Sequence, residues 1–152
     1  MSTATLEPVH RVTDDSVLEE RREEMWKGVR FVPPMPNVMH QRLKDELLMY
    51  LTAHWAKPMT PRVISECNLT TPEDEANWTD NYRGPDLVLL TRDQFHMIKG
   101  AYIVGAPLAV VEIHSMGDRS YEKLDFYSNL GVQEVWIIDR SSRFPEIFAK
   151  DK

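Results

Sequence analysis

The chain has 152 residues, 42% of them hydrophobic, which suits one domain with a substantial core better than two domains. Its formal net charge of -6 argues against a strongly basic protein that coats nucleic acid without specificity, because such binding is driven largely by lysine and arginine, although a local basic patch stays compatible with it. The single cysteine, Cys67, excludes an intramolecular disulfide, and the sequence has neither the apolar core of a signal peptide nor a run long enough to cross a bilayer, so we expect a cytoplasmic protein without a membrane segment.

The first third of the chain predicts two helices with a short strand between them. Residues 1–13 have no convincing period and are expected to be flexible, whereas residues 14–152 are expected to form one domain. The run DDSVLEERREEMW, at 14–26, predicts a short helix with an aspartate as its N-cap, and GVRFVPPMPN predicts a brief strand that ends at the prolines. From Asn37 an apolar stripe at helical spacing predicts an amphipathic helix, with Lys44 off the centre of the stripe. The stripe consists of His40, Leu43, Leu47, Tyr50, Leu51 and His54.

The remainder of the chain predicts several strands and one further helix. PRVISECNL is typical of a strand, and TTPEDEANWTDNYRG is typical of a polar loop. PDLVLL and APLAVVEIH predict two strands that are buried on both faces, with RDQFHMIKG between them. SYEKLDFYSNLG predicts a helix capped by Asp118 and ending at Gly131, and QEVWIID predicts the next strand, which suggests a βαβ unit in a mixed sheet. PEIFAK is a candidate edge strand.

Two charged residues lie where the pattern is otherwise apolar. Alternation along the strand places Glu112 on one face with Leu108, Val110 and His114. On the following helix, Lys123 lies in the middle of the inward face, together with Phe126, Tyr127 and Leu130. Because burial of an unpaired charge costs several kcal/mol or more, both groups need a local partner.

The order of the elements suggests what that partner is. A helix that packs back onto its own strand could carry Lys123 toward Glu112, and Asp86 opens the other buried strand. Mg²⁺ takes oxygen ligands, commonly one or two carboxylates completed by waters and substrate phosphate. A cation held by Asp86 and Glu112 would neutralise the buried acids and position a water for attack on a phosphodiester.

These residues resemble the PD-(D/E)xK nuclease superfamily, in which an Asp opens one strand, a Glu lies on the next and a Lys lies nearby. The segment GPDLVLL supplies the Pro-Asp as Pro85 and Asp86. More closely, the chain resembles the Uma-two family of restriction-endonuclease-like proteins from about residue 24 to residue 139. The segments that carry this resemblance, through their order and spacing, are EMWKG, PPMPNVMHQRL, GPDLVLL, GAPLAVVEIHS and EKLDFYSNLGVQEVWIID.

The resemblance implies an α/β fold with a restriction-endonuclease-like core, a mixed β-sheet flanked by helices. It implies that Asp86 and Glu112 are metal ligands and that the catalytic lysine has moved to the following helix, as Lys123. Glu24 matches a further acidic residue of the site, and His40 matches a histidine that opens a helix. The sequence departs from the family after the strand, where Ser115 is followed by Met116 in place of the usual proline.

Structural roles are the alternatives for each of these residues. Asp86 could be a turn aspartate that caps backbone amides, and Glu112 with Lys123 could be a buried ion pair without catalytic purpose. Glu24 lies in the run EERREE, where a solvated helix face is the usual explanation. His114 could be a ligand, a base or a polar strand end, because it occupies the position where the wider superfamily more often has its lysine.

The hypothesis from the sequence is a nuclease that uses Mg²⁺ or Mn²⁺ and acts on nucleic acid, with DNA as the expected substrate. Asp86 and Glu112 would hold the metal, Lys123 would stabilise charge on the phosphate, and Glu24 and His114 are further candidates. A homodimer is an option by analogy with nucleases that cut two strands. The alternatives are a noncatalytic module of the same fold that binds nucleic acid or protein, and a glycosidase-like hydrolase that uses its two carboxylates without metal.

Overall fold

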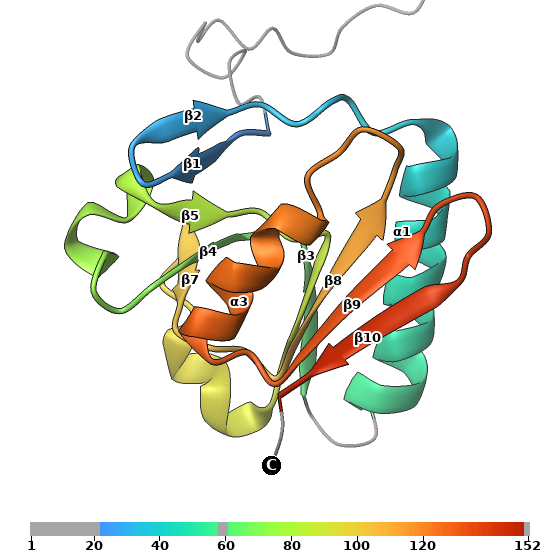
Figure 1. Ribbon diagram of the computed structural model, residues 1–152. Helices are drawn as coiled ribbons and strands as arrows, with labels where there is room; N and C mark the ends of the chain where they lie inside the picture. Colours follow the sequence, from blue (N-terminus) through green and yellow to red (C-terminus); the bar gives the residue numbers. More distant parts are fainter. Residues whose placement is uncertain (1–21, 58–60, 151–152) are drawn as a thin grey trace, which may run out of the picture.

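The computed structural model describes residues 22–57 and 61–150, whose strands form two five-stranded sheets (Figure 1). The first sheet has the order β2-β1-β5-β4-β7, and the second has the order β10-β9-β8-β6-β3. The strands of the first sheet are β1 (Glu24–Trp26), β2 (Val29–Phe31), β4 (Asn68–Thr70), β5 (Tyr82–Arg83) and β7 (Tyr102–Val104). Those of the second are β3 (Arg62–Ser65), β6 (Leu87–Leu90), β8 (Ala109–His114), β9 (Glu134–Asp139) and β10 (Pro145–Ala149).

The second sheet is mixed and contains the expected βαβ unit. β8 and β9 are parallel and are connected through the helix α3 (Leu124–Leu130), while β6, β3 and β10 run antiparallel to their neighbours. β6 and β8 read as continuous apolar runs because both faces of the sheet are covered. The prediction of an α/β fold with a mixed sheet flanked by helices is confirmed.

Helix α1 (Val38–Leu51) covers one face of the second sheet. Its N-cap is Asn37, whose side chain accepts a hydrogen bond from the His40 backbone N at 2.9 Å, and a π-helical turn (Thr52–Ala56) continues it. Leu43, Leu47 and Leu51 of the predicted stripe pack on the sheet, but Tyr50 and His54 are exposed. Lys44, which was predicted off the stripe, is buried, and its ammonium lies 2.9 Å from Glu66 Oε1. The side chains between α1 and the sheet include Leu43, Leu47, Leu51, Leu87, Leu89, Val111 and Ile113.

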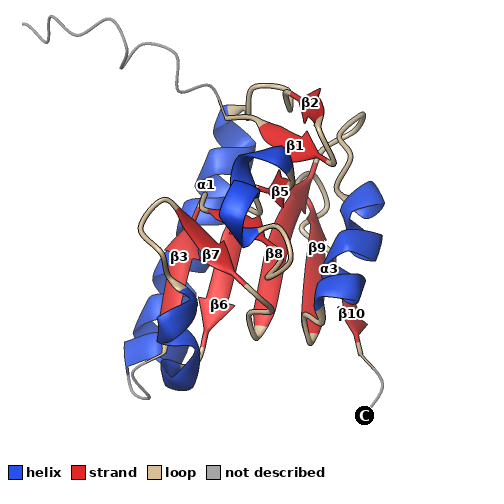
Figure 2. Cartoon of the chain, turned by 90° about the vertical axis from the view of Figure 1, so that its left-hand side faces the viewer, coloured by secondary structure: helices blue, strands red, loops and turns tan. Residues whose placement is uncertain are grey.

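Helix α3 covers the opposite face, so that the sheet lies between the two helices (Figure 2). A 3-10 turn (Tyr121–Lys123) precedes it, and it ends at Gly131, whose φ of 96° is the left-handed conformation that favours glycine. Leu69 and Ile103 of the first sheet belong to the same hydrophobic cluster as Tyr127 of α3. The two sheets and α3 therefore share one core.

Some expectations about local structure are wrong. The helix predicted at 14–26 lies partly outside the described residues, as does the whole segment 1–13, but Glu24–Trp26 is a strand. It pairs with Val29–Phe31 through a turn at Lys27 and Gly28, both with positive φ, so tertiary pairing overrides helix propensity. Asp118 fixes the loop before α3 instead of capping the helix.

The polar segment 70–84 was expected to be loop, yet it contains β5 and a 3-10 helix (Glu75–Asp80). β7 also lies outside the predicted strands, because its three residues gain their regular structure only by pairing with β4. Within the described residues, no helix is long and apolar enough to cross a membrane.

Candidate active site

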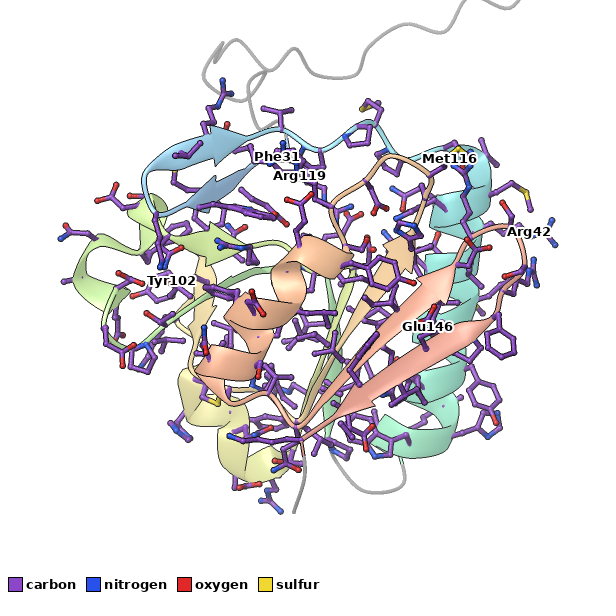
Figure 3. The ribbon with its side chains drawn as sticks, viewed as in Figure 1. Phe31, Arg42, Tyr102, Met116, Arg119 and Glu146 are labelled. Carbon is purple, nitrogen blue, oxygen red and sulfur yellow. The ribbon has the colours of Figure 1, made fainter. Side chains whose placement is uncertain are left out.

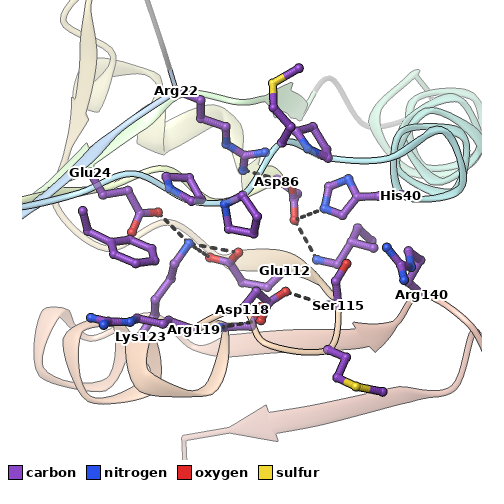
Figure 4. Close-up of a pocket in the computed structure, with 18 residues that line it drawn as sticks. Arg22, Glu24, His40, Asp86, Glu112, Ser115, Asp118, Arg119, Lys123 and Arg140 are labelled. Carbon is purple, nitrogen blue, oxygen red and sulfur yellow. Dashed lines mark hydrogen bonds and ion pairs between the residues drawn. The ribbon is translucent and has the colours of Figure 1, made fainter.

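A pocket of about 160 Å³ lies where β1, β8, the start of α1 and the loop after β2 meet (Figure 4). Asp86, immediately before β6, and Glu112, in β8, both line it. The register that pairs Leu87 with Val111 places these two carboxylates opposite one another on adjacent strands. Lys123 and Glu24 line the same pocket, so four of the five predicted site residues are brought together.

One lysine binds two carboxylates at the centre of the site. The Lys123 ammonium lies 2.6 Å from Glu24 Oε1, 3.0 Å from Glu112 Oε1 and 3.2 Å from Glu112 Oε2. All three side chains are buried. Burial lowers the pKa of Lys123, but the Glu112 and Glu24 carboxylates raise it above its ordinary value. The lysine therefore keeps its charge inside the fold.

Glu24 is held in place by the first sheet. Its Oε1 accepts a hydrogen bond from the Gly84 backbone N at 2.9 Å, and its Oε2 accepts one from Trp26 Nε1 at 2.8 Å. A solvated helix face was the alternative from the sequence, and it does not hold because Glu24 is a buried strand residue.

The environment of Glu112 disfavours its charged form. Burial and the nearby Asp86 and Glu24 carboxylates raise the pKa of Glu112 to about 7, against the lowering effect of Lys123. The Tyr127 hydroxyl donates a hydrogen bond to Glu112 Oε1 at 2.5 Å, and burial raises the pKa of Tyr127 well above its ordinary value. An added cation at this carboxylate would favour its ionised form.

Asp86 is surrounded by donors instead. Its oxygens accept hydrogen bonds from Arg22 Nη2 at 2.9 Å and from the Ile113 backbone N at 2.7 Å, and His40 Nε2 lies 3.4 Å away. Burial raises the pKa of Asp86, but the His40 hydrogen bond, the Arg22 charge and the Ile113 amide lower it to about 2. Asp86 is thus ionised at neutral pH, and its bonds extend beyond those of a simple turn cap.

His114 shares a strand face with Glu112 but does not line the pocket. Its Nδ1 lies 2.7 Å from Asp118 Oδ1, and its ring packs edge-on against Tyr121. Asp118 also accepts hydrogen bonds from the backbone N atoms of Ser115 and Ser120. His114 therefore belongs with the loop between β8 and α3.

Arg22 and Tyr127 contact the carboxylates of the site, but the sequence pattern gives neither of them a role there. Arg22 lay in a charged run that predicted a helix, and Tyr127 had the spacing of an ordinary core position. For His40, the apolar stripe favours a hydrogen-bonded structural histidine first and support of the site second, and its place at the start of α1 directs it to Asp86. The signal for Tyr127 was its hydroxyl group, which needs a hydrogen-bond partner at an otherwise apolar position of the helix.

The carboxylates of the pocket are possible ligands of a divalent cation. Within residues 22–57 and 61–150 no group of three or more His, Cys, Asp or Glu side chains is arranged to hold a metal ion. Mg²⁺ needs fewer protein ligands, commonly one or two carboxylates completed by waters and phosphate. Asp86 and Glu112 are two carboxylates of this kind on the wall of the pocket, so the donor types match this cation, while Arg22 and Lys123 contact their oxygens.

Comparisons with known proteins agree with the fold. No curated protein matches the sequence. A crystal structure described as a putative nuclease belonging to DUF820, from Anabaena variabilis, superposes with a TM-score of 0.62, covering 84% of this chain and 76% of that chain at 19% identity. The family model described as "Uma2: Putative restriction endonuclease" matches residues 10–152. This match over nearly the whole sequence shows that the chain belongs to the Uma2 family.

Proposed function

We propose that the protein is a metal-dependent nuclease that hydrolyses phosphodiester bonds in nucleic acid, with DNA as its substrate. The observation that carries this proposal is the meeting of Asp86, Glu112 and Lys123 in one surface pocket. A purely structural ion pair needs only one acid and one base, whereas this pocket holds a second carboxylate across the strands and a third at Glu24. Membership of a restriction-endonuclease family supports the same reaction class.

Each residue would have a distinct role. Asp86 and Glu112 would hold Mg²⁺ or Mn²⁺, which when bound supplies positive charge for the scissile phosphate and makes a water more acidic. Lys123 would stabilise the negative charge that develops on the phosphate, as a compact cation already aimed by two carboxylates. Glu24 would act as a positioning residue, because it contacts Lys123 and is fixed by Gly84 and Trp26.

Cleavage tests with nucleic acids address the proposal. Single-stranded and duplex DNA and RNA would be incubated with the protein in Mg²⁺, in Mn²⁺ and in chelator. We expect cleavage only with a divalent cation and a loss on the order of 10² to 10³-fold in Asp86→Asn, Glu112→Gln and Lys123→Ala. Lys44→Ala is the matched control, since Lys44 is equally buried and ion-paired but lies outside the pocket. Cleavage that persists in chelator would overturn the proposal.

A noncatalytic module of the same fold is the second candidate, and one observation favours it. The oxygens of Asp86 and Glu112 already have protein partners, with Arg22 on Asp86 and Lys123 on Glu112. A closed network of this kind could serve stability alone. Binding to nucleic acid or protein without cleavage under any metal condition would select this candidate.

If duplex DNA is cut on both strands, a homodimer would provide the two pockets required.

A further inference from the structure

Two arginines lie at the mouth of the pocket on opposite sides. Figure 4 shows Arg119 at one end and Arg140 at the other, with Glu112 and Asp118 between them. The Arg140 backbone N donates a hydrogen bond to the His114 carbonyl at 2.9 Å, which holds the residue at the end of β8. Among the described residues, the Arg140 side chain has no hydrogen bond or ion pair. Its guanidinium is therefore available to an external anion.

Arg119 is held by aromatic packing. Its guanidinium lies 4.5 Å from the centre of the Phe31 ring, and Figure 3 shows the two side chains next to each other. The carboxylate nearest to it is that of Glu122, at 3.8 Å, and both of these side chains are about half exposed, so this ion pair is weak. Stacking on the ring fixes the guanidinium without using its donors, which leaves them free for a phosphate.

Two methionines at the same mouth are almost fully exposed. Met35 is 93% exposed and Met116 is 97% exposed, and both line the pocket. Met35 is flanked by prolines, which restrict the backbone, and Met116 belongs to the loop that Asp118 fixes through Ser115 and Ser120. The exposure of these apolar side chains is thus set by constrained backbone, and it suits contact with an apolar surface.

We propose that the mouth of the pocket binds a single-stranded stretch of nucleic acid. Arg119 and Arg140 contact the phosphates on either side of the scissile phosphate, which lies in the pocket. Met35 and Met116 contact the faces of unstacked bases. A duplex hides its base faces by stacking, whereas a single strand exposes them to apolar side chains that lie beside arginines. This inference rests on the proposed function, because it takes the pocket to be the place where the strand is cut.

Binding measured without cleavage tests the inference. The probes are a fluorescein-labelled single-stranded DNA of mixed sequence and its duplex, and fluorescence anisotropy is recorded in Ca²⁺ without Mg²⁺ over a series of salt concentrations. We expect Arg119→Gln and Arg140→Gln each to weaken single-strand binding several-fold and to reduce the slope of log K against log salt by about 0.7. Arg143→Gln is the matched control, because Arg143 is near Arg140 in sequence but is paired with Glu46 outside the pocket.

The methionines have a separate signature. Met35→Ala and Met116→Ala are expected to weaken single-strand binding with no change in salt slope and to reduce the preference for single strand over duplex. Met49→Ala, on an exposed part of α1, is the control. Thermal unfolding and circular dichroism verify that each variant keeps its fold.

The outcomes separate this inference from the proposed function. Arginine variants that keep the parental affinity and salt slope, or a parent that binds duplex as tightly as single strand, would overturn it even if cleavage occurs. Binding with the expected pattern but no cleavage in any metal would support it and overturn the proposed function instead. An absence of binding to either DNA would also count against it.

Discussion

Lys123 Nζ lies 2.6 Å from Glu24 Oε1, and both side chains are buried. Glu24 belongs to β1 of the first sheet, whereas Lys123 belongs to the turn that leads into α3. The ion pair therefore joins the first sheet to the segment that leads into α3, at the wall of the pocket. Because the same ammonium also binds Glu112 of β8, one cation compensates two buried carboxylates from different parts of the chain.

Replacement of Lys123 should destabilise the fold strongly. Lys123→Met leaves Glu24 and Glu112 buried next to one another without their cation, and breaking a buried pair in this way costs about 3–5 kcal/mol. Lys44→Met should cost less, because its partner Glu66 is partly exposed and can be hydrated again. Urea denaturation at neutral pH gives the free energy of unfolding of both variants. Equal losses in the free energy of unfolding would show that the ion pairs of Lys123 matter no more to stability than the pair of Lys44 with Glu66.

The stability of the parent should fall between about pH 4.5 and pH 7. Burial and the neighbouring acids raise the pKa of Glu112 to about 7, so the folded state binds this proton more tightly than the unfolded state. The stabilisation that Glu112 provides is fully present below its pKa in the unfolded chain. It is lost as the pH rises through its pKa in the folded state, and amounts to about 3 kcal/mol at most. Glu112→Gln should flatten this part of the profile in urea denaturation. A variant profile parallel to that of the parent would refute the assignment.

Substitution of the two basic candidates near Glu112 should affect activity differently. Lys123→Ala is expected to lose nearly all cleavage, whereas His114→Ala should be milder, because His114 contacts Asp118 and lies outside the pocket. His114→Lys added to Lys123→Ala should restore part of the rate if a lysine at that position reaches the same phosphate. Initial cleavage rates measure the series. If His114→Ala is inactive and Lys123→Ala is not, the roles must be exchanged.

Much of the second sheet could be predicted from the sequence because its signals are local. The stripe from His40 to Leu51 defines α1, and the two apolar runs define β6 and β8, with Asp86 immediately before β6 and Glu112 within β8. The inward position of Lys123 followed from helical spacing. These patterns depend on periodicity within one element, which a single sequence shows directly.

Apart from β2, which lies in the predicted strand GVRFVPPMPN, the first sheet could not be predicted in the same way. Its strands have two or three residues, too few for a period, and they are fixed by pairing between distant segments, as Met25 pairs with Tyr82. The partners of the site were missed for the same reason. Arg22 reaches Asp86 across 64 positions in sequence, and Tyr127 reaches Glu112 only after α3 has packed on β8.

Direct measurement of cation binding tests the central claim, that Asp86 and Glu112 form a metal site beside Lys123. Isothermal titration of the parent with Mn²⁺ should show one ion per chain. Thermal unfolding should show a higher melting temperature with Mn²⁺, since a ligand that binds only the folded state stabilises it by mass action. Asp86→Asn and Glu112→Gln should lose both responses, and Lys44→Ala should retain them. If both carboxylate variants bind Mn²⁺ with the stoichiometry and affinity of the parent, the claim is contradicted.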